Sequence, residues 1–578
     1  MYPSFRIASG SVDVGYDALA RAIVDAVTAS SSTSVTIDGY GGVMWETVRQ
    51  HLHAHLLSLG YSPNWIAVRQ ALRTPEEIDR IVEPHLGGDD PLWGTAFNGD
   101  LIDFFDTSAL AQLLPDASAS INIVYGEGAA LAEWNGQVVY LDVPKNEIQF
   151  RSRAGSITAI GAREAGPAKK MYKRFYFVDW PVLSRHKASL LPRIAIAVDA
   201  QRVGDPVFMR GETLRASLSA MARTCFRPRP WFEPGPWGGQ WIKHTITQLP
   251  QDVPNYAWSF ELIAPENGIM IESDGVLFEC SLDTLMFQES PSVLGRASER
   301  FGAEFPIRFD FLDTFDGGNL SVQCHPRTEY IQREFGERFT QDETYYILDC
   351  KPGAEVYLGF NEGIDAAAFR GALERSRDAG SEVDVRQFVN TVAAHRHDLF
   401  LIPNGTIHCS GRDNLVLEIS ATPYIFTFKM YDWLRRDLDG NLRPINIERA
   451  FDNLDFARTA SVVESELISR PVVVGEGSDW RIVHLPTHRE HFYDVRRVEF
   501  DTTVEIDTDN DCHVMSLVEG LSIILENADG SQHRFNYAET FVVPAAAGRY
   551  RMINEGSERA MVIQSWVKHD HVGATHST

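Results

Sequence analysis

Cysteine is scarce in this chain, and its copies are widely spaced. The 578 residues include six cysteines, and none of them forms a Cys-x-x-Cys pair. This pattern favours neither a disulfide framework nor a thiolate zinc site, so we expect a protein of the reducing cytoplasm. Long hydrophobic runs are also missing, and residues 1–20 lack the basic and apolar blocks of an export signal. We therefore expect neither a membrane protein nor export.

Positive charge is in short supply as well. The chain has 53 Lys and Arg residues against 79 Asp and Glu residues, which gives a formal net charge of −26. Such a surface repels nucleic acids and anionic membranes, so neither is expected as a partner. With 44% hydrophobic and 23% charged residues, the composition is that of a globular protein long enough for two to four domains.

The first part of the chain alternates helix-like and strand-like segments. Residues 16–30 (YDALARAIVDAVTAS) and 45–60 have apolar residues at helical spacing, and residues 34–42 (SVTIDGYGG) are a short apolar run that ends in glycines. Strand, glycine turn and helix form the opening unit of a nucleotide-binding α/β domain. Later apolar runs, among them residues 176–183 (YFVDWPVL), are interpreted as further strands of the same sheet. We expect an α/β domain over residues 1–215.

From about residue 220 the pattern changes to strands separated by Gly, Pro, Asn and Asp turns, which is typical of a β-sandwich or jelly roll. Residues 363–380 (GIDAAAFRGALERSRDAG) read as a helical insertion. The strand-rich pattern is repeated near the end, where residues 527–531 (NADGS) indicate a hairpin turn. We expect one β-barrel over residues 216–475 and a smaller one over 476–578, hence a multidomain chain of α/β and all-β parts.

Four polar residues of the first expected barrel form a candidate metal-ligand set. Gln323 and His325 are two residues apart in a strand-like segment, so their side chains point the same way; Glu343 begins another strand, and His408 follows a Pro-Asn-Gly turn. Two imidazoles, a carboxylate and an amide oxygen suit zinc or another divalent first-row metal, with one position open for substrate or water. The alternative is that these groups hydrogen-bond within the core or lie at the surface.

The sequence around these four residues resembles class I mannose-6-phosphate isomerases, which are zinc enzymes of the cupin superfamily. The resemblance implies that Gln323, His325, Glu343 and His408 bind zinc, and that the protein interconverts an aldose and a ketose phosphate through a cis-enediol. The C-terminal region is similar to the second, cupin-like domain of that family, and we expect it to hold no metal because it has no His-x-His. The segments that carry the resemblance occur in family order: PGPWGGQW (234–241), FDFLDTFDGGNLSVQCHP (309–326), DETYYIL (342–348), DLFLIPNGTIHCSG (398–411) and LVLEISATPYIFTFKMYDW (415–433).

The same resemblance adds two catalytic candidates. Glu418 lies in the apolar strand-like segment NLVLEIS, where the family also has a glutamate, and burial would raise its pKa towards the range that suits a general base. Its alternative role is to orient a ligand histidine. Lys429 is expected to contact the distal polar group of the substrate, although it lacks the bidentate fork of the family's arginine.

The chain departs from the family near the expected sugar phosphate. The family typically has Gly-Lys-Thr-Glu before its ligand glutamate, whereas residues 341–344 read Gln-Asp-Glu-Thr and are interpreted as placing Asp342 where a lysine would be. An anion in place of a cation disfavours a dianionic ligand. Mannose 6-phosphate and a related, unphosphorylated sugar therefore both remain open as substrates.

The glycine turn of the first domain lines up with the phosphate-binding loop of uridine-kinase-like P-loop proteins. A working loop reads GxxxxGK[ST], because its backbone N–H groups and lysine bind phosphates while its hydroxyl binds Mg²⁺. With Gly39 as the first glycine, Met44, Trp45 and Glu46 take the places of the second glycine, the lysine and the hydroxyl residue. We expect a kinase-like fold that does not hydrolyse ATP and holds no cofactor.

A basic segment follows in the same domain. Residues 151–174 contain seven Lys and Arg residues against the single acid Glu164. In so acidic a chain this is a candidate anion site. The alternative, which we favour, is that these cations pair with acidic groups from elsewhere.

The sequence therefore predicts a cytoplasmic, metal-dependent aldose–ketose isomerase that acts on a small sugar or sugar phosphate and carries an inactive kinase-like module. A non-catalytic sugar or nucleotide sensor is the alternative. The intact ligand set favours the enzyme, whereas Asp342 and Trp45 favour the sensor. The oligomeric state is not predicted.

Overall fold

The structure is a computed structural model of the chain. It divides the chain into two compact units, which we call the N-terminal unit (Tyr2–Ala222 with Pro265–Ser290) and the C-terminal unit (Arg223–Ala264 with Pro291–Thr578). None of the described helices is long and apolar enough to cross a bilayer. The residues that the structure describes are 2–7, 10–30, 32–88, 90, 92–264, 266–421, 426–436, 440 and 442–571.

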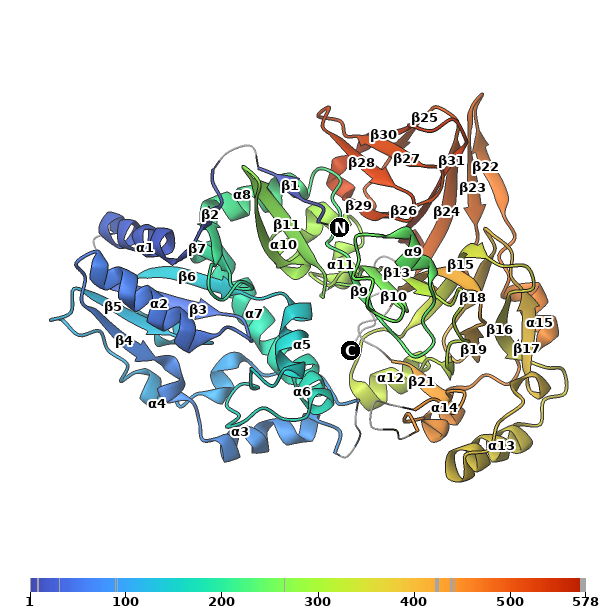
Figure 1. Ribbon diagram of the computed structural model, residues 1–578, viewed down its shortest axis with the longest axis horizontal. Helices are drawn as coiled ribbons and strands as arrows, with labels where there is room; N and C mark the ends of the chain where they lie inside the picture. The colour runs from blue at the N-terminus through green and yellow to red at the C-terminus, as the bar shows by residue number, and fades with distance from the viewer. Residues whose placement is uncertain are drawn as a thin grey trace. The chain divides into compact units, whose positions relative to one another are not determined.

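A seven-stranded sheet forms the centre of the N-terminal unit (Figure 1). Its strand order is β2-β8-β7-β6-β3-β5-β4, and the five strands from β7 to β4 run parallel to their neighbours. β3 is the first of these parallel strands in the sequence and lies in the middle of them. The next two strands, β4 and β5, lie on one side of it, and β6 and β7 lie on the other. Ligands of such sheets bind beyond the carboxyl ends of the strands at this point of reversal. The strands are β2 (Asp13–Val14), β3 (Ser34–Gly39), β4 (Pro63–Ala67), β5 (Ile121–Tyr125), β6 (Gln137–Asp142), β7 (Ile194–Asp199) and β8 (Val207–Arg210).

The helices of this unit agree with the sequence patterns at two of three places. Both predicted helices form, as α1 and α2, and every residue of β3 between them is buried, as expected for a parallel sheet. The expected strand over residues 176–183 is wrong, because Phe175–Asp179 form a π-helical turn that leads into α7. A short apolar run that is buried on all sides has no periodicity that separates strand from helix. The helices are α1 (Tyr16–Ser30), α2 (Trp45–Ser58), α3 (Pro75–Val82), α4 (Thr107–Leu110), α5 (Lys145–Arg153), α6 (Ala168–Arg174), α7 (Trp180–Leu190) and α8 (Gly211–Met221).

A hairpin from the middle of the sequence completes the N-terminal unit. Strands β11 (Gly268–Ser273) and β12 (Val276–Ser281) form a three-stranded sheet with β1 (Phe5–Arg6), and helix α10 (Leu282–Leu294) follows. Asp283, at the start of that helix, forms a buried ion pair with Lys145 of α5. This hairpin interrupts the region that the sequence suggested as one β-domain.

The C-terminal unit begins with two antiparallel sheets, of six and five strands, whose orders are β18-β15-β20-β13-β10-β9 and β17-β16-β19-β14-β21. The predicted helical insertion forms α13; its N-cap Asp365 accepts a hydrogen bond from Ala368 N, and Gly380 ends it in the left-handed region. The strands of the six-stranded sheet are β9 (Trp231–Glu233), β10 (Trp258–Leu262), β13 (Arg308–Asp313), β15 (Asp342–Cys350), β18 (Leu399–Ile402) and β20 (Asn414–Ala421). Those of the five-stranded sheet are β14 (Val322–Cys324), β16 (Glu355–Phe360), β17 (Val389–Ala393), β19 (His408–Ser410) and β21 (Phe428–Tyr431). The helices of this unit are α9 (Trp241–Thr245), α11 (Ser298–Phe301), α12 (Thr328–Phe335), α13 (Ala366–Ala379), α14 (Ile447–Asn453) and α15 (Ala460–Glu466).

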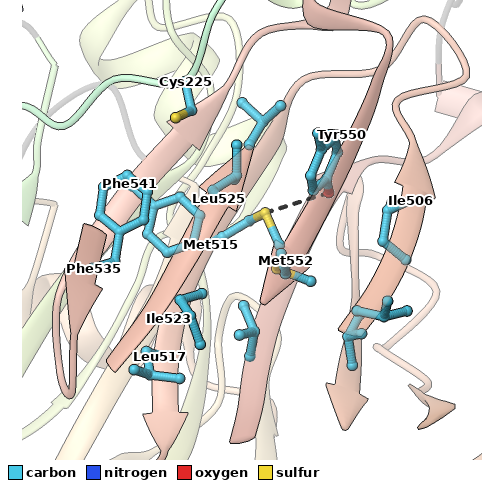
Figure 2. Close-up of a cluster of buried hydrophobic side chains, with 14 of the residues drawn as sticks. Cys225, Ile506, Met515, Leu517, Ile523, Leu525, Phe535, Phe541, Tyr550 and Met552 are labelled. Carbon is cyan, nitrogen blue, oxygen red and sulfur yellow. Dashed lines mark hydrogen bonds between the residues drawn. The ribbon is translucent and has the colours of Figure 1, made fainter. Parts of the chain in front are cut away.

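Two further antiparallel sheets follow in the same unit, with the orders β22-β23-β24-β31-β26-β29 and β25-β30-β27-β28. Their apolar side chains form one buried cluster, in which Phe535 stacks on Phe541 and Tyr550 donates a hydrogen bond to the sulfur of Met515 (Figure 2). The predicted 527–531 turn joins β27 to β28. The strands are β22 (Val472–Glu476), β23 (Trp480–Leu485), β24 (Tyr493–Phe500), β25 (Thr503–Asp507), β26 (His513–Glu519), β27 (Ser522–Glu526), β28 (Gln532–Asn536), β29 (Thr540–Val543), β30 (Arg549–Asn554) and β31 (Ala560–Val567).

Candidate metal centre

Three short strands bring the four predicted ligand residues together. Gln323 of β14 lies directly opposite His408 of β19, so the two side chains share one face of the five-stranded sheet. His325 comes directly after β14, two residues beyond Gln323, and so shares that face. Glu343 comes from β15 of the six-stranded sheet. The inner faces of the two sheets thus supply the two sides of one site.

The side-chain atoms of this group are close and buried. Glu343 Oε1 lies 3.0 Å from His325 Nε2, and Glu343 Oε2 lies 3.3 Å from His408 Nε2. The Gln323 side-chain amide lies 3.3 Å from the same His408 nitrogen. His325, Glu343 and His408 form a group whose ligand atoms all lie within 4.8 Å of one another, which is the spacing that one metal ion requires.

Backbone carbonyls fix the orientation of both imidazole rings. His325 Nδ1 lies 2.9 Å from the carbonyl oxygen of Phe426, and His408 Nδ1 lies 2.9 Å from that of Thr406. A carbonyl oxygen only accepts hydrogen bonds, so each Nδ1 carries the hydrogen and each neutral ring presents an Nε2 lone pair to Glu343. Lone pairs that face a carboxylate in a buried site need a positive charge between them. A metal cation fits this donor set.

The charges of the site act strongly on one another. Burial lowers the pKa of His325, but the negative charge of Glu343 outweighs this effect and raises it. Burial likewise raises the pKa of Glu343, and the two imidazoles reverse that effect and hold it well below its usual value. The carboxylate is therefore the ionised partner of the group, as a metal ligand must be.

Gln341 is a part of the site that the sequence analysis missed. It lies two residues before Glu343, on the same side of the strand, and its amide donates a hydrogen bond to Glu343 Oε1 while its own oxygen accepts one from Phe426 N at 3.1 Å. Gln341 thereby orients the carboxylate towards the histidines. The signal in the sequence was its spacing from Glu343.

Asp342 does not face this site, and the interpretation that it replaces a substrate-facing lysine is wrong. Side chains alternate along a strand, so Asp342 points to the opposite side of β15 from Glu343. Its carboxylate accepts hydrogen bonds from the backbone N–H and the side-chain amide of Asn404, at 2.8 and 3.0 Å. Its negative charge is thus held in a separate polar contact.

Glu418 lies in the middle of β20, between two polar neighbours on adjacent strands. It is directly opposite Asp310 of β13 on one side and Tyr345 of β15 on the other. Burial raises the pKa of Glu418 well above its usual value, and the charges of Asp310 and Glu343 raise it further. A carboxyl in such surroundings carries a proton near neutral pH and can exchange it.

Arg308, Asp310 and Tyr345 were not predicted from the sequence. Arg308 Nε lies 3.3 Å from Asp310 Oδ1. The single positive charge of Arg308 thus lies beside two carboxyl groups, those of Asp310 and Glu418. Glu418 Oε1 and the Tyr345 hydroxyl are buried, and neither has a hydrogen-bond partner within the described part of the chain. Buried polar groups without a partner are costly, so these two groups call for a role in the site.

Lys429 lies on β21 directly opposite Gln323, so its side chain shares the face of the ligand residues. It is partly exposed. The structure thus brings Gln323, His408 and Lys429 of the five-stranded sheet, with His325 directly after β14, to face Glu343 and Glu418 of the six-stranded sheet.

The last two sheets have a different interior. His513 Nδ1 contacts the Tyr550 hydroxyl at 3.0 Å, and apolar side chains fill the space between the strands (Figure 2). Across the residues that the structure describes, His325, Glu343 and His408 are the group of His, Cys, Asp and Glu side chains that is spaced for a metal.

The basic segment 151–174 of the N-terminal unit is engaged internally. Arg151 donates to the carbonyl oxygens of Gly42, Ala200 and Gln201, and Arg174 pairs with Asp179 at 2.7 Å. Arg163 also pairs with Glu76, whereas Lys169 and Lys170 are exposed, so acidic partners are seen for only part of the segment.

Comparison with known proteins identifies relatives of part of the chain. The sequence similarity is to mannose-6-phosphate isomerases. ManA of Bacillus subtilis is 27% identical over 227 residues, which are 39% of this chain and 67% of that enzyme. The mannose-6-phosphate isomerase of Streptococcus mutans is 27% identical over 232 residues, 40% of this chain and 68% of that enzyme. The crystal structure of the Bacillus subtilis mannose 6-phosphate isomerase aligns with a TM-score of 0.48 at 19% identity, covering 59% of this chain and 99% of that structure.

The N-terminal part matches a different family. Residues 15–223 match a family model that is described as a domain of unknown function, DUF8485. The match ends next to the boundary of the N-terminal unit at Ala222.

Proposed function

We propose that this protein is a metal-dependent aldose–ketose isomerase that acts on mannose 6-phosphate or a related sugar through a cis-enediol. The observation that carries the proposal is the convergence of His325, Glu343 and His408 around one point, in a segment similar in sequence to mannose-6-phosphate isomerases. In this proposal residues 216–475 and 476–578 are two cupin-type barrels, of which the first holds the active site.

His325, Glu343 and His408 would hold a zinc ion or another divalent first-row metal, and Gln323 would be the fourth ligand. The Gln323 amide lies beside His408, and a rotation of that amide by half a turn presents its oxygen to the same point. When bound, the ion supplies Lewis-acid stabilisation of negative charge on the substrate oxygens. The carbonyls of Phe426 and Thr406 keep both imidazole lone pairs directed at the ion.

Glu418 is proposed as the group that moves the proton between neighbouring sugar carbons. Isomerisation requires one group that removes a proton and returns it, and a carboxyl whose pKa is raised by burial does both near neutral pH. Asp310 and Arg308 would tune the charge of Glu418 from the adjacent strand. The alternative role of Glu418 is to position the ligand group, which metal analysis of a variant would distinguish.

Lys429 is proposed to contact the distal polar group of the sugar, because it shares the face of Gln323 and carries the positive charge that an anionic or hydroxyl-rich group requires. Asp342, whose carboxylate is hydrogen-bonded to Asn404, is proposed to have no contact with the sugar, so it is no argument against a phosphorylated substrate. Both phosphorylated and free sugars remain candidates.

The N-terminal unit is proposed to be a P-loop kinase-like module that does not hydrolyse ATP. Strand β3 ends in the glycine turn and leads into α2, whose first residues are Trp45 and Glu46 in place of the phosphate-binding lysine and the hydroxyl. A sensor in place of an enzyme is the alternative for the whole chain.

A substrate panel tests the proposal. The purified protein, loaded with Zn²⁺, Mn²⁺ or Co²⁺ and analysed for bound metal, is incubated with mannose 6-phosphate and with a series of free aldoses, and the ketose is followed by NMR. Conversion of at least one sugar, abolished by chelation, is expected. A fully loaded protein that converts none of them would favour the sensor.

A further inference from the structure

A large cavity lies in the N-terminal unit, at the carboxyl ends of the parallel strands. It has a volume of about 670 Å³, which is in the range of small-molecule sites. Its walls come from the loop after β3, the ends of β4 and β5, the 156–163 segment and helix α7. This is the point where the chain reverses its direction of building the sheet, which is where open α/β sheets bind their ligands.

Aromatic rings form much of the wall. Trp45, Tyr125, Phe175 and Trp180 all line the cavity. The rings of Trp45 and Tyr125 contact each other, with centroids 6.3 Å apart and a tilt of 53°, so a small group lying against both can be within about 6 Å of both ring centres. Such a pair of π-faces attracts a cation.

Among the residues that the structure describes, no ion pair with Lys, Arg or His is found for Glu127, a carboxyl that lines this cavity. Burial raises its pKa to about 7, the Trp45 indole opposes this shift, and the neighbouring charges of Asp38 and Asp179 strengthen it. Those two acids are compensated, because Asp38 contacts His186 Nε2 at 2.8 Å and Asp179 pairs with Arg174. An incoming cation would therefore find its complementary charge at Glu127.

The same loop is poorly suited to an anion. Asp38 already occupies two backbone N–H groups that flank the glycine turn, since its Oδ1 accepts from Gly39 N at 2.7 Å and from Gly128 N at 3.1 Å. Glu46, in the first turn of α2, adds a negative charge where a phosphate would lie. A phosphate would meet two carboxylates here.

The three arginines among the lining residues lie at the rim of the cavity, where each already has a partner. Arg69 is 3.8 Å from Glu46 and its side chain is 73% exposed, while Arg163 pairs with Glu76 at 2.6 Å and is 71% exposed. Arg73 Nε donates to the carbonyl of Asp103. They belong to the exposed rim, and the acidic Glu127 with its aromatic neighbours remains the distinguishing polar group of the cavity.

We propose that this cavity is a binding site for a small organic cation of the amidinium, guanidinium or alkylammonium class, whose charge lies against the Trp45 and Tyr125 rings on the cavity side and pairs with Glu127. The proposal concerns the N-terminal unit alone and is independent of the isomerase activity. It assigns to the module a ligand of the opposite charge to the phosphates that its glycine turn suggests.

Titration of the full-length protein with benzamidinium tests this inference, with benzamide as a neutral ligand of nearly the same shape. Isothermal calorimetry is expected to show saturable binding of benzamidinium and binding of benzamide that is at least about tenfold weaker. A tenfold difference in affinity corresponds to about 1.4 kcal/mol of binding free energy. Glu127→Gln is expected to weaken benzamidinium binding by about tenfold or more and to remove the preference over benzamide.

Two further variants complete the test. Trp45→Leu, which removes one π-face, should also weaken benzamidinium binding, whereas Glu83→Gln, an exposed carboxyl that does not line the cavity, should leave it unchanged. Circular dichroism checks that each variant is folded, and Trp45→Phe serves if Trp45→Leu is not. Absence of saturable binding, equal affinity for benzamide, an unaffected Glu127→Gln variant, or competition by inorganic phosphate would each overturn the proposal.

Discussion

His325 Nε2 and Glu343 Oε1 lie 3.0 Å apart, although they come from different sheets. His325 directly follows β14, and Glu343 lies in β15. The contact joins the inner faces of the two sheets, and both rings of the site are oriented by backbone carbonyls that leave their lone pairs towards the carboxylate. A buried arrangement of this kind is stable only with a positive charge at its centre.

Glu418→Gln should lower kcat by about 10²- to 10⁴-fold and leave the bound metal in place, because the amide keeps the shape of the side chain but cannot take up a proton. Steady-state kinetics together with metal analysis of the same sample provide the measurement. Glu374→Gln, on α13, is the matched control and should behave as wild type. Loss of metal from the Glu418 variant would instead assign this residue to positioning a ligand.

Lys429→Met should raise KM by about tenfold or more with a smaller change in kcat, since a contact with the distal end of the sugar contributes equally to substrate and transition-state binding. Lys429→Arg keeps the charge and should restore part of the affinity. The assay is a comparison of KM for phosphorylated and free sugars. An unchanged KM for every substrate would show that Lys429 does not contact the sugar.

Asp283→Asn should destabilise the N-terminal unit by about 3–5 kcal/mol at neutral pH, because it leaves buried Lys145 without its partner. Burial alone would raise the pKa of Asp283, but Lys145 and Lys187 outweigh it and lower the pKa to about 2. A folded-state pKa below the unfolded value gives stability that is present above about pH 4 and is lost as the pH falls through about 2.

Denaturant unfolding of wild type and Asp283→Asn at several pH values measures this effect, and their difference should shrink between about pH 4 and pH 2. Asp274→Asn, in the exposed turn between β11 and β12, is the control and should cost little. A constant difference across that range would contradict the ion-pair explanation.

Phe541→Ala should cost about 3–5 kcal/mol, because Phe541 is fully buried and stacks on Phe535 in the filled interior of the last two sheets (Figure 2). Leu521→Ala, whose side chain is exposed, should change stability by less than about 0.5 kcal/mol. Chemical denaturation monitors both. A small effect of Phe541→Ala would mean that this interior is loosely packed and has room for a ligand.

The sequence predicted the parts of the fold that local patterns determine. The period of 3.6 residues in 16–30 and 45–60 gave both helices nearly to the residue, and the glycine-bounded run at 34–42 gave β3. The strand predicted for residues 176–183 was wrong because this apolar run lies in a largely buried helical segment, and its sequence has no periodicity that distinguishes helix from strand. Residues Pro265–Ser290 belong to the N-terminal unit because of long-range contacts such as the Lys145–Asp283 ion pair, and no local sequence pattern predicts such contacts.

The candidate site was predictable to a similar degree. Gln323 and His325 were selected because they lie two residues apart in a strand-like segment. Glu343 and His408 were selected by residue type and by the family-like segments around them. Asp342 was misplaced because a family alignment ignores which face of a strand each residue takes. Asp310, Arg308 and Tyr345 were missed because their role depends on cross-strand register, which appears only in the folded sheets. Gln341 was missed although its spacing of two from Glu343 was visible in the sequence.

Metal content of the His325→Ala variant tests the central claim most directly. Wild type and His395→Ala, whose side chain is 75% exposed and remote in role, are loaded with zinc, passed through gel filtration and analysed by mass spectrometry beside His325→Ala. The account predicts about one ion per chain in the first two proteins and almost none in the third. A His325→Ala protein that retains its full complement of metal would contradict it.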